Sequence, residues 1–168
     1  MITPFPQVMR PVLLLLKGLI VLNVVALALF LLVFAGSFTD GFAASIVNQQ
    51  TTASGQAMLA AVRAVMVIAI LVVPFAHLLL TRLAAIVETV GAGDPFVPSN
   101  AQRLKTIAWC LLAVQLLDLG FGAISFAVEP AFGWSFALTG WLAIVLLFVL
   151  ARVFEYGTGM RDELAGTV

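Results

Sequence analysis

The chain of 168 residues is dominated by apolar side chains: 63% are hydrophobic, only 10% are charged, and the formal net charge is zero. Its mean hydropathy of +1.18 lies far outside the range of soluble domains, in which roughly a quarter of residues are charged. Composition therefore excludes a soluble globular domain and indicates an integral membrane protein, in which each crossing helix needs about 20 apolar residues.

Four intervals with few or no charges are long enough to cross a bilayer. They lie between Lys17 and Asp40, between Arg63 and Arg82, over residues 106–128 with Asp118 inside, and between Glu129 and Arg152. Runs such as LNVVALALFLLVFAG are apolar at every position, whereas membrane β-strands alternate apolar and polar residues. We therefore predict an all-α polytopic fold, a four-transmembrane-helix bundle with short loops, as a single membrane domain over 1–168. The expected crossings are residues 12–36, 58–88, 101–128 and 135–157.

The first two crossings each carry one polar side chain near the middle of the bilayer. Asn23 is close to the centre of the first crossing, and His77 lies just after Pro74, slightly past the centre of the second. Polar groups at this depth are costly, so they mark either a function or a polar contact between helices. The intervening loop, residues 38–56, is polar and nearly uncharged, and we expect it to be a solvated connector.

The segment GDPFVPSNAQRLK, residues 93–105, joins the second and third crossings. Gly91 and Gly93 predict the end of one helix, because glycine readily takes the left-handed capping conformation. The two prolines favour an extended backbone between the two helices. S-x-x-Q over residues 99–102 predicts a capping box that begins the next helix. Turn chemistry does not explain an exposed Phe96, so a docking surface is the alternative interpretation. Its candidate contacts are Asp94, Pro95, Phe96, Asn100, Arg103 and Leu104.

Two more polar residues lie within the third crossing. Asp118 is near its midplane, and Gln115 lies three residues earlier on a similar face. Together with Asn23 and His77 they are candidates for one intramembrane polar layer. These residues either lock the bundle through interhelical hydrogen bonds of about 1 kcal/mol each, or Asp118 and His77 form a proton-responsive or ligand-binding pair.

The basic residues favour one orientation in the membrane. Arg63 is on one side of the membrane. The other seven basic residues flank the start of the first crossing, the end of the last crossing or the 91–105 turn, which all lie on the opposite side. Loops rich in Lys and Arg stay in the cytoplasm. We therefore expect both termini and this turn to be cytoplasmic.

Two stretches resemble a known family. G-D-P-F-V-x-x-N-A-x-R-L at 93–104, with I-A-W at 107–109, is similar to the characteristic segment of DUF2975, a family of small bacterial membrane proteins of unknown function. The end of the chain, from FALTGWLAIVLLFVLARVF to the terminal T-V, resembles the final helix and tail of that family. The resemblance implies four transmembrane helices in the bacterial inner membrane. It also implies a cytoplasmic helix-turn-helix regulator as a partner, because such regulators are commonly encoded beside members of the family.

No standard catalytic constellation is visible in the sequence. With one His and one Cys, the chain has no zinc-protease, nucleophile-elbow or phosphate-loop motif, and we expect no catalytic residue, metal or cofactor. Eight scattered basic residues argue against direct nucleic-acid binding. Besides the lipid bilayer, we expect a cytoplasmic partner and consider a homo-oligomer. The favoured function is a membrane-bound regulatory, sensing or binding protein. The alternative is a subunit of an oligomeric small transporter or channel.

Overall fold

The computed structural model describes residues 5–47, 52–127 and 134–165, and five helices lie within them. In chain order they are α1 (Phe5–Gly36), α2 (Asp40–Val47), α3 (Thr52–Gly91), α4 (Pro98–Ala127) and α5 (Leu138–Ala165). Residue 128, where the third predicted crossing ends, lies outside the described residues. The short helix α2 forms part of the loop that we expected to be a solvated connector.

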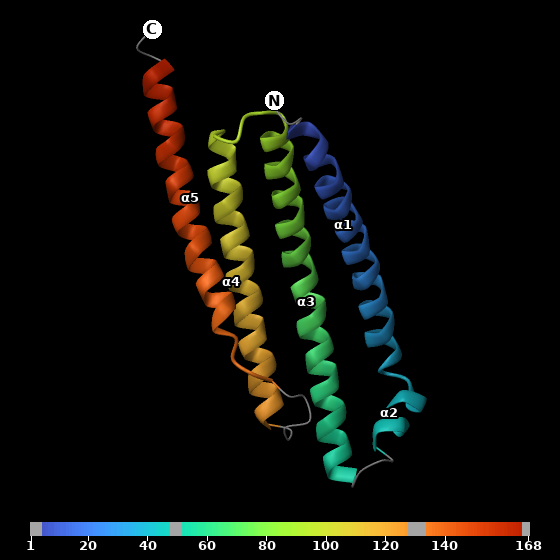
Figure 1. Ribbon diagram of the computed structural model, residues 1–168. Helices are drawn as coiled ribbons and strands as arrows, with labels where there is room; N and C mark the ends of the chain where they lie inside the picture. The colour runs from blue at the N-terminus through green and yellow to red at the C-terminus, as the bar shows by residue number, and fades with distance from the viewer. Residues whose placement is uncertain (1–4, 48–51, 128–133, 166–168) are drawn as a thin grey trace.

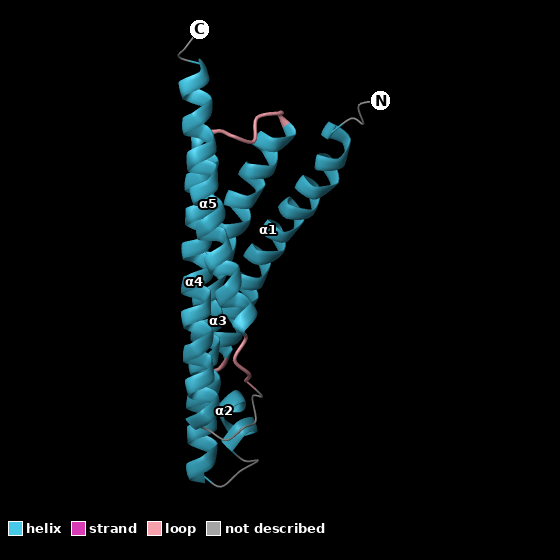
Figure 2. Cartoon of the chain, turned by 60° about the vertical axis from the view of Figure 1, so that its left-hand side comes forward, coloured by secondary structure: helices cyan, strands magenta, loops and turns pink. Residues whose placement is uncertain are grey.

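The four long helices lie side by side in the order α1, α3, α4, α5, each running antiparallel to its neighbour (Figure 1). Contacts agree with this order: α3 packs against α1 and α4, α4 packs against α5, and α2 packs against α3. A view from another side shows the first turns of α1 standing apart from α5 (Figure 2). The all-α bundle is therefore built from pairs of sequence neighbours, with α1 and α5 at its two edges.

Four helices of the described chain, α1, α3, α4 and α5, are long and apolar enough to cross a membrane. Their outer faces carry large exposed apolar side chains, among them Leu14 on α1, which is 71% exposed. In water such surfaces would aggregate, but in a bilayer lipid tails cover them. The chain is thus a multi-pass membrane protein, in agreement with its composition.

Helix α3 ends in a hydrogen-bonded cap centred on Gly93. The amide of Asp94 donates to the carbonyl of Thr89 at 3.1 Å, and the amide of Gly93 donates to that of Val90 at 3.0 Å. Gly93 has φ of +88°, so this is a Schellman motif with glycine in the left-handed position. Of the two glycines expected to end the helix, Gly93 supplies the turn conformation, whereas Gly91 is the last helical residue.

Helix α4 begins one residue before the predicted capping box. Its first residue is Pro98, and the amide of Asn100 donates to the carbonyl of Val97 at 2.9 Å. Proline is favoured at a first helical position because its missing N–H would have no partner there. Ser99 therefore lies inside the first turn and not at the cap, and the capping-box prediction is wrong.

We expect Gly93→Ala to lower the free energy of unfolding by about 1 kcal/mol, because an L residue in the left-handed region is strained. The matched control is Gly91→Ala. A Cβ there would meet the Met9 side chain at an ordinary 3.6 Å, and helical Gly→Ala substitutions stabilise by about 0.5–1 kcal/mol. Thermal unfolding in detergent micelles measures both. Equal effects would contradict the role of Gly93.

Candidate functional site

Asn100 fastens the turn between α3 and α4 from inside. Its side chain is fully buried, and Nδ2 donates to Thr89 Oγ1 at 2.8 Å and to the carbonyl of Pro95 at 2.9 Å. Its Oδ1 accepts from Arg103 Nη1 at 2.8 Å, and the same guanidinium nitrogen donates to the carbonyl of Ala85 at 3.2 Å. The Asn100 amide therefore connects the end of α3, the extended segment between the helices and the start of α4.

This network decides which residues of the turn can face a partner. Asn100 and Leu104 are buried, and Arg103 is half-buried with its guanidinium directed at backbone and amide oxygens. Phe96 differs from them because 45% of its surface is exposed. Of the six candidate contact residues, Phe96 thus offers the most prominent apolar surface, while Asn100, Arg103 and Leu104 hold the turn together.

Phe96 rests on the far end of α5. Its ring lies 5.4 Å from that of Phe154, centroid to centroid. Gly157 is next to it, and a Cβ at that position would approach the Phe96 ring to 3.3 Å. Helix α5 continues past this point, beyond the level of the turn (Figure 1). We call residues 152–165, the part of α5 from its first basic residue onward, the stem.

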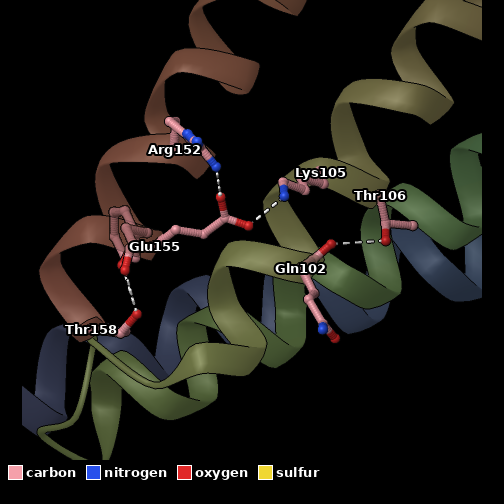
Figure 3. A network of polar contacts seen from close by, with 7 residues as sticks. Gln102, Lys105, Thr106, Arg152, Glu155 and Thr158 are labelled. Carbon is pink, nitrogen blue, oxygen red and sulfur yellow. Dashed lines mark hydrogen bonds and ion pairs between the residues drawn. The ribbon is translucent and has the colours of Figure 1, made fainter. Parts of the chain in front are cut away.

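Polar contacts also join the stem to α4 (Figure 3). Lys105 of α4 and Glu155 of the stem form an ion pair, and Arg152 Nη1 donates to the other oxygen of Glu155 at 3.0 Å. Thr158, buried one turn further on, donates from its hydroxyl to the carbonyl of Glu155 at 2.9 Å. Arg152 and Glu155 are three residues apart on one helix, but the contact with Lys105, fifty residues away, depends on the tertiary structure.

Two shallow depressions follow the outer side of the stem. One, of about 450 Å³, is apolar and is lined by Phe96, Val153, Tyr156, Gly157 and Met160. The other, of about 280 Å³, shares two of these residues and is lined by Arg152, Glu155, Tyr156, Gly159 and Met160. The Arg152 guanidinium lies 5.4 Å from the centroid of the Tyr156 ring. A hydrophobic surface beside a cation is therefore presented at the end of the bundle that holds the turn.

Asn23 and His77 occupy the same level of the α1–α3 pair. At one end of this antiparallel pair Met9 meets Gly91, and at the other Arg63 Nη2 donates to the Ser37 carbonyl at 2.7 Å. Asn23 is fourteen residues from both Met9 and Ser37, and His77 is fourteen residues from both Gly91 and Arg63. The Asn23 Oδ1 atom is buried and has no hydrogen-bond partner.

Gln115 and Asp118 lie instead on the side of α4 that faces α5 and the segment preceding it. Asp118 Oδ2 accepts a hydrogen bond from Trp134 Nε1 at 3.2 Å, and the Gln115 amide reaches the position where a Cβ on Gly140 would stand. The α3–α4 register, in which Gly120 meets Ile68, sets Asp118 about two turns, or roughly 10 Å, from the level of His77. Asn23 and His77 thus share one level of the α1–α3 pair, whereas Gln115 and Asp118 contact Gly140 of α5 and Trp134, which precedes it.

Arg63 makes contacts that sequence reasoning did not identify. Besides bonding to the Ser37 carbonyl, its guanidinium carbon lies 4.4 Å from the centroid of the Phe38 ring. Cys110 is buried in α4, where it acts as a small packing residue. Among the described residues no group of three or more His, Cys, Asp or Glu side chains could hold a metal ion.

The α3–α4 turn and the stem fall in a stretch that matches a family model. This family is described as a protein of unknown function (DUF2975), and its match covers residues 47–168 of the chain. The chain belongs to the DUF2975 family. The matched region contains α3, α4 and α5 and all six candidate contact residues of the turn. Comparisons with curated proteins and with solved structures gave no match.

Proposed function

We propose that this DUF2975 protein is a membrane-bound binding or regulatory protein that presents its α3–α4 turn and stem to a cytoplasmic partner. The observation that carries the proposal is the contrast within the turn. Asn100 is fully buried in a hydrogen-bonded network, whereas Phe96 remains 45% exposed beside an apolar depression. Aromatic side chains, phenylalanine among them, are enriched in protein interfaces relative to the rest of the surface.

The charges of this end support a cytoplasmic location. Arg82, Arg103, Lys105 and Arg152 lie where the apolar runs of three helices end, and basic residues favour the cytoplasmic side of a membrane. The family resemblance implies a helix-turn-helix regulator as the partner. The proposed role is to hold such a protein at the membrane.

The proposal is tested by co-expressing the protein with the product of its neighbouring gene and measuring how much of that product sediments with the membranes. We expect association with the wild-type protein and a loss of at least about tenfold with Phe96→Glu, because a carboxylate would replace the apolar contact. The matched control is Phe136→Glu, an exposed phenylalanine (55%) at the opposite end of the bundle. No association, or equal loss with both variants, would refute the proposal.

A further inference from the structure

The chain just before α5 runs beside α4 without helical structure. Residues 134–137 are not helical, yet the indole of Trp134 lies against Gly122 of α4, where a Cβ would stand 2.7 Å from two atoms of the ring. The same indole donates a hydrogen bond to Asp118. Helix α5 accordingly begins well short of the end of α4 (Figure 1). Both Gly122 and Asp118 belong to the candidate membrane span Pro98–Ala127.

The level of Asp118 can be measured along α3. Arg63 and Arg82 bound the apolar run of α3 and are nineteen positions apart, a rise of about 28 Å, which matches the thickness of a hydrocarbon core. Ile68, five positions from Arg63, meets Gly120 of α4. Asp118 is therefore about 10 Å inside the edge of the hydrocarbon core that Arg63 marks. The segment that contacts Asp118 lies within this core.

Helix α5 begins deeper still. Gln115, three positions along α4 from Asp118, reaches Gly140, so Gly140 is about 15 Å inside the level of Arg63. The first helical residue, Leu138, comes two positions earlier, about 12 Å inside that level. Non-helical backbone therefore covers the outermost part of the fourth crossing.

Lipid tails cannot cover this stretch of backbone. Within the described chain, the backbone groups of residues 134–136 make no hydrogen bond, and residues 135–137 are exposed. Each unsatisfied N–H or C=O costs several kcal/mol in hydrocarbon, so non-helical backbone at this depth occurs only where it is buried in protein or lines a water-filled cavity. Because the described chain does not bury the segment, water is the partner that we expect for its backbone groups.

The charge of Asp118 also favours water at this level. Its Oδ2 atom accepts a hydrogen bond from Trp134 Nε1 at 3.2 Å, but no ion pair among the described residues involves it. Arg63 and His77 are each about 10 Å from its level, in opposite directions. Ionisable residues inside a membrane face the bundle interior or a water-filled cavity, and they mark ion pathways. An unpaired carboxylate that water reaches attracts cations.

We propose that residues 134–137 and the last turns of α4 line a water-filled vestibule, which opens at the end of the bundle opposite the α3–α4 turn and ends at Asp118, a binding site for small cations. Trp134 positions the carboxylate through its hydrogen bond to Oδ2. Its ring is held in turn by edge contacts with Phe126 and Phe136, at centroid distances of 5.7 and 6.3 Å. Aromatic faces beside the carboxylate add to the attraction for an organic cation.

Thiol modification tests whether water reaches the segment. In a Cys110→Ala background, which removes the one native cysteine, we expect Ser135→Cys to react with a membrane-impermeant methanethiosulfonate reagent. The control Leu32→Cys lies on α1, where the side chain is 68% exposed. It is five residues before Ser37, which bonds to Arg63, and so stands at a similar depth. We expect it to react at least about tenfold more slowly, because lipid excludes the charged reagent.

The same reagent locates the end of the vestibule. Asp118→Cys should react from the side of the membrane that modifies Ser135→Cys, as measured in intact cells and in inverted vesicles. Leu116→Cys, two residues away on α4 and 55% exposed, should not react. Ser99→Cys in the α3–α4 turn should react from the opposite side. Modification of Ser135→Cys as slow as that of Leu32→Cys, or from the same side as Ser99→Cys, would overturn the inference.

The charge of the reagent tests the cation site. We expect Ser135→Cys to react at least about tenfold faster with a trimethylammonium reagent than with a sulfonate reagent, each rate taken relative to free cysteine, because the carboxylate raises the local concentration of cations. Asp118→Asn keeps the shape without the charge, so the thiol should still react but the preference should vanish. Equal rates with Asp118 present, or a preference that persists in Asp118→Asn, would overturn the cation site. These measurements use this protein alone, so their failure leaves the proposed cytoplasmic partner untouched.

Discussion

Replacing Asn100 with leucine should lower the free energy of unfolding by about 2–4 kcal/mol, because buried groups that lose their hydrogen-bond partners bear the full cost of desolvation. The substitution removes the donor for the Pro95 carbonyl and for Thr89 Oγ1, and the acceptor for Arg103. Leucine has the same branching and the same number of side-chain heavy atoms as asparagine, so the substitution leaves no cavity. Thermal and denaturant unfolding in detergent micelles measures it.

Two further variants separate this effect from general sensitivity of the turn. Ser99→Ala changes the exposed neighbouring residue, and we expect a change within about 0.5 kcal/mol. Asn100→Asp keeps the acceptor for Arg103 but places a carboxylate oxygen against the Pro95 carbonyl, so it should remain destabilised. If Asn100→Leu were as stable as Ser99→Ala, the amide would not hold the turn together.

Gly122→Ala should disrupt the contact between α4 and the segment that precedes α5. A Cβ at Gly122 would stand 2.7 Å from two atoms of the Trp134 ring, closer than real Cβ contacts allow. The bulky indole must move, which costs about 1–3 kcal/mol. Its movement also weakens the hydrogen bond that Trp134 donates to Asp118.

Gly120→Ala is the matched control, two residues away on the same helix. Its added Cβ would meet Ile68 at 3.8 Å, an ordinary contact, so we expect no loss of stability. In a Trp134→Ala background, Gly122→Ala should lose most of its cost, since the group that it displaces is gone. Unfolding temperatures of the four proteins measure this coupling. A cost that persists without Trp134 would contradict the contact.

The location of the intramembrane polar residues could be predicted only in part. Their depth follows from counting residues along each helix, and Asn23 and His77 do share a level. Their faces do not follow from counting, because Gln115 and Asp118 point into the α4–α5 contact, where Trp134 donates to Asp118. The chain is apolar around most of each helix, so no polar side marks which face meets which neighbour.

In the α3–α4 turn, too, some features could be predicted from the sequence and others could not. Glycine and proline preferences are properties of the local backbone, and they located the cap of α3 at Gly93 and the extended segment after it. The exposure of Phe96 was expected from its place in a turn, but the burial of Asn100 and the support under the Phe96 ring were not predictable, because both depend on residues distant in sequence. Thr89 and Ala85 receive the hydrogen bonds, and Phe154 and Gly157 of the stem support the Phe96 ring.

From the sequence alone, this DUF2975 protein is predictable as a helical chain with four helices able to cross a membrane, and the position of one connecting turn is predictable as well. These features follow from hydrophobicity and backbone preference, which act over a few residues or one helix. Packing between the helices determines that α1, α3, α4 and α5 lie in a row, that Lys105 pairs with Glu155, and that Phe96 rests on Phe154 of α5. The register and rotation of each helix are set by packing against its neighbours, and in a uniformly apolar chain no local signal specifies them.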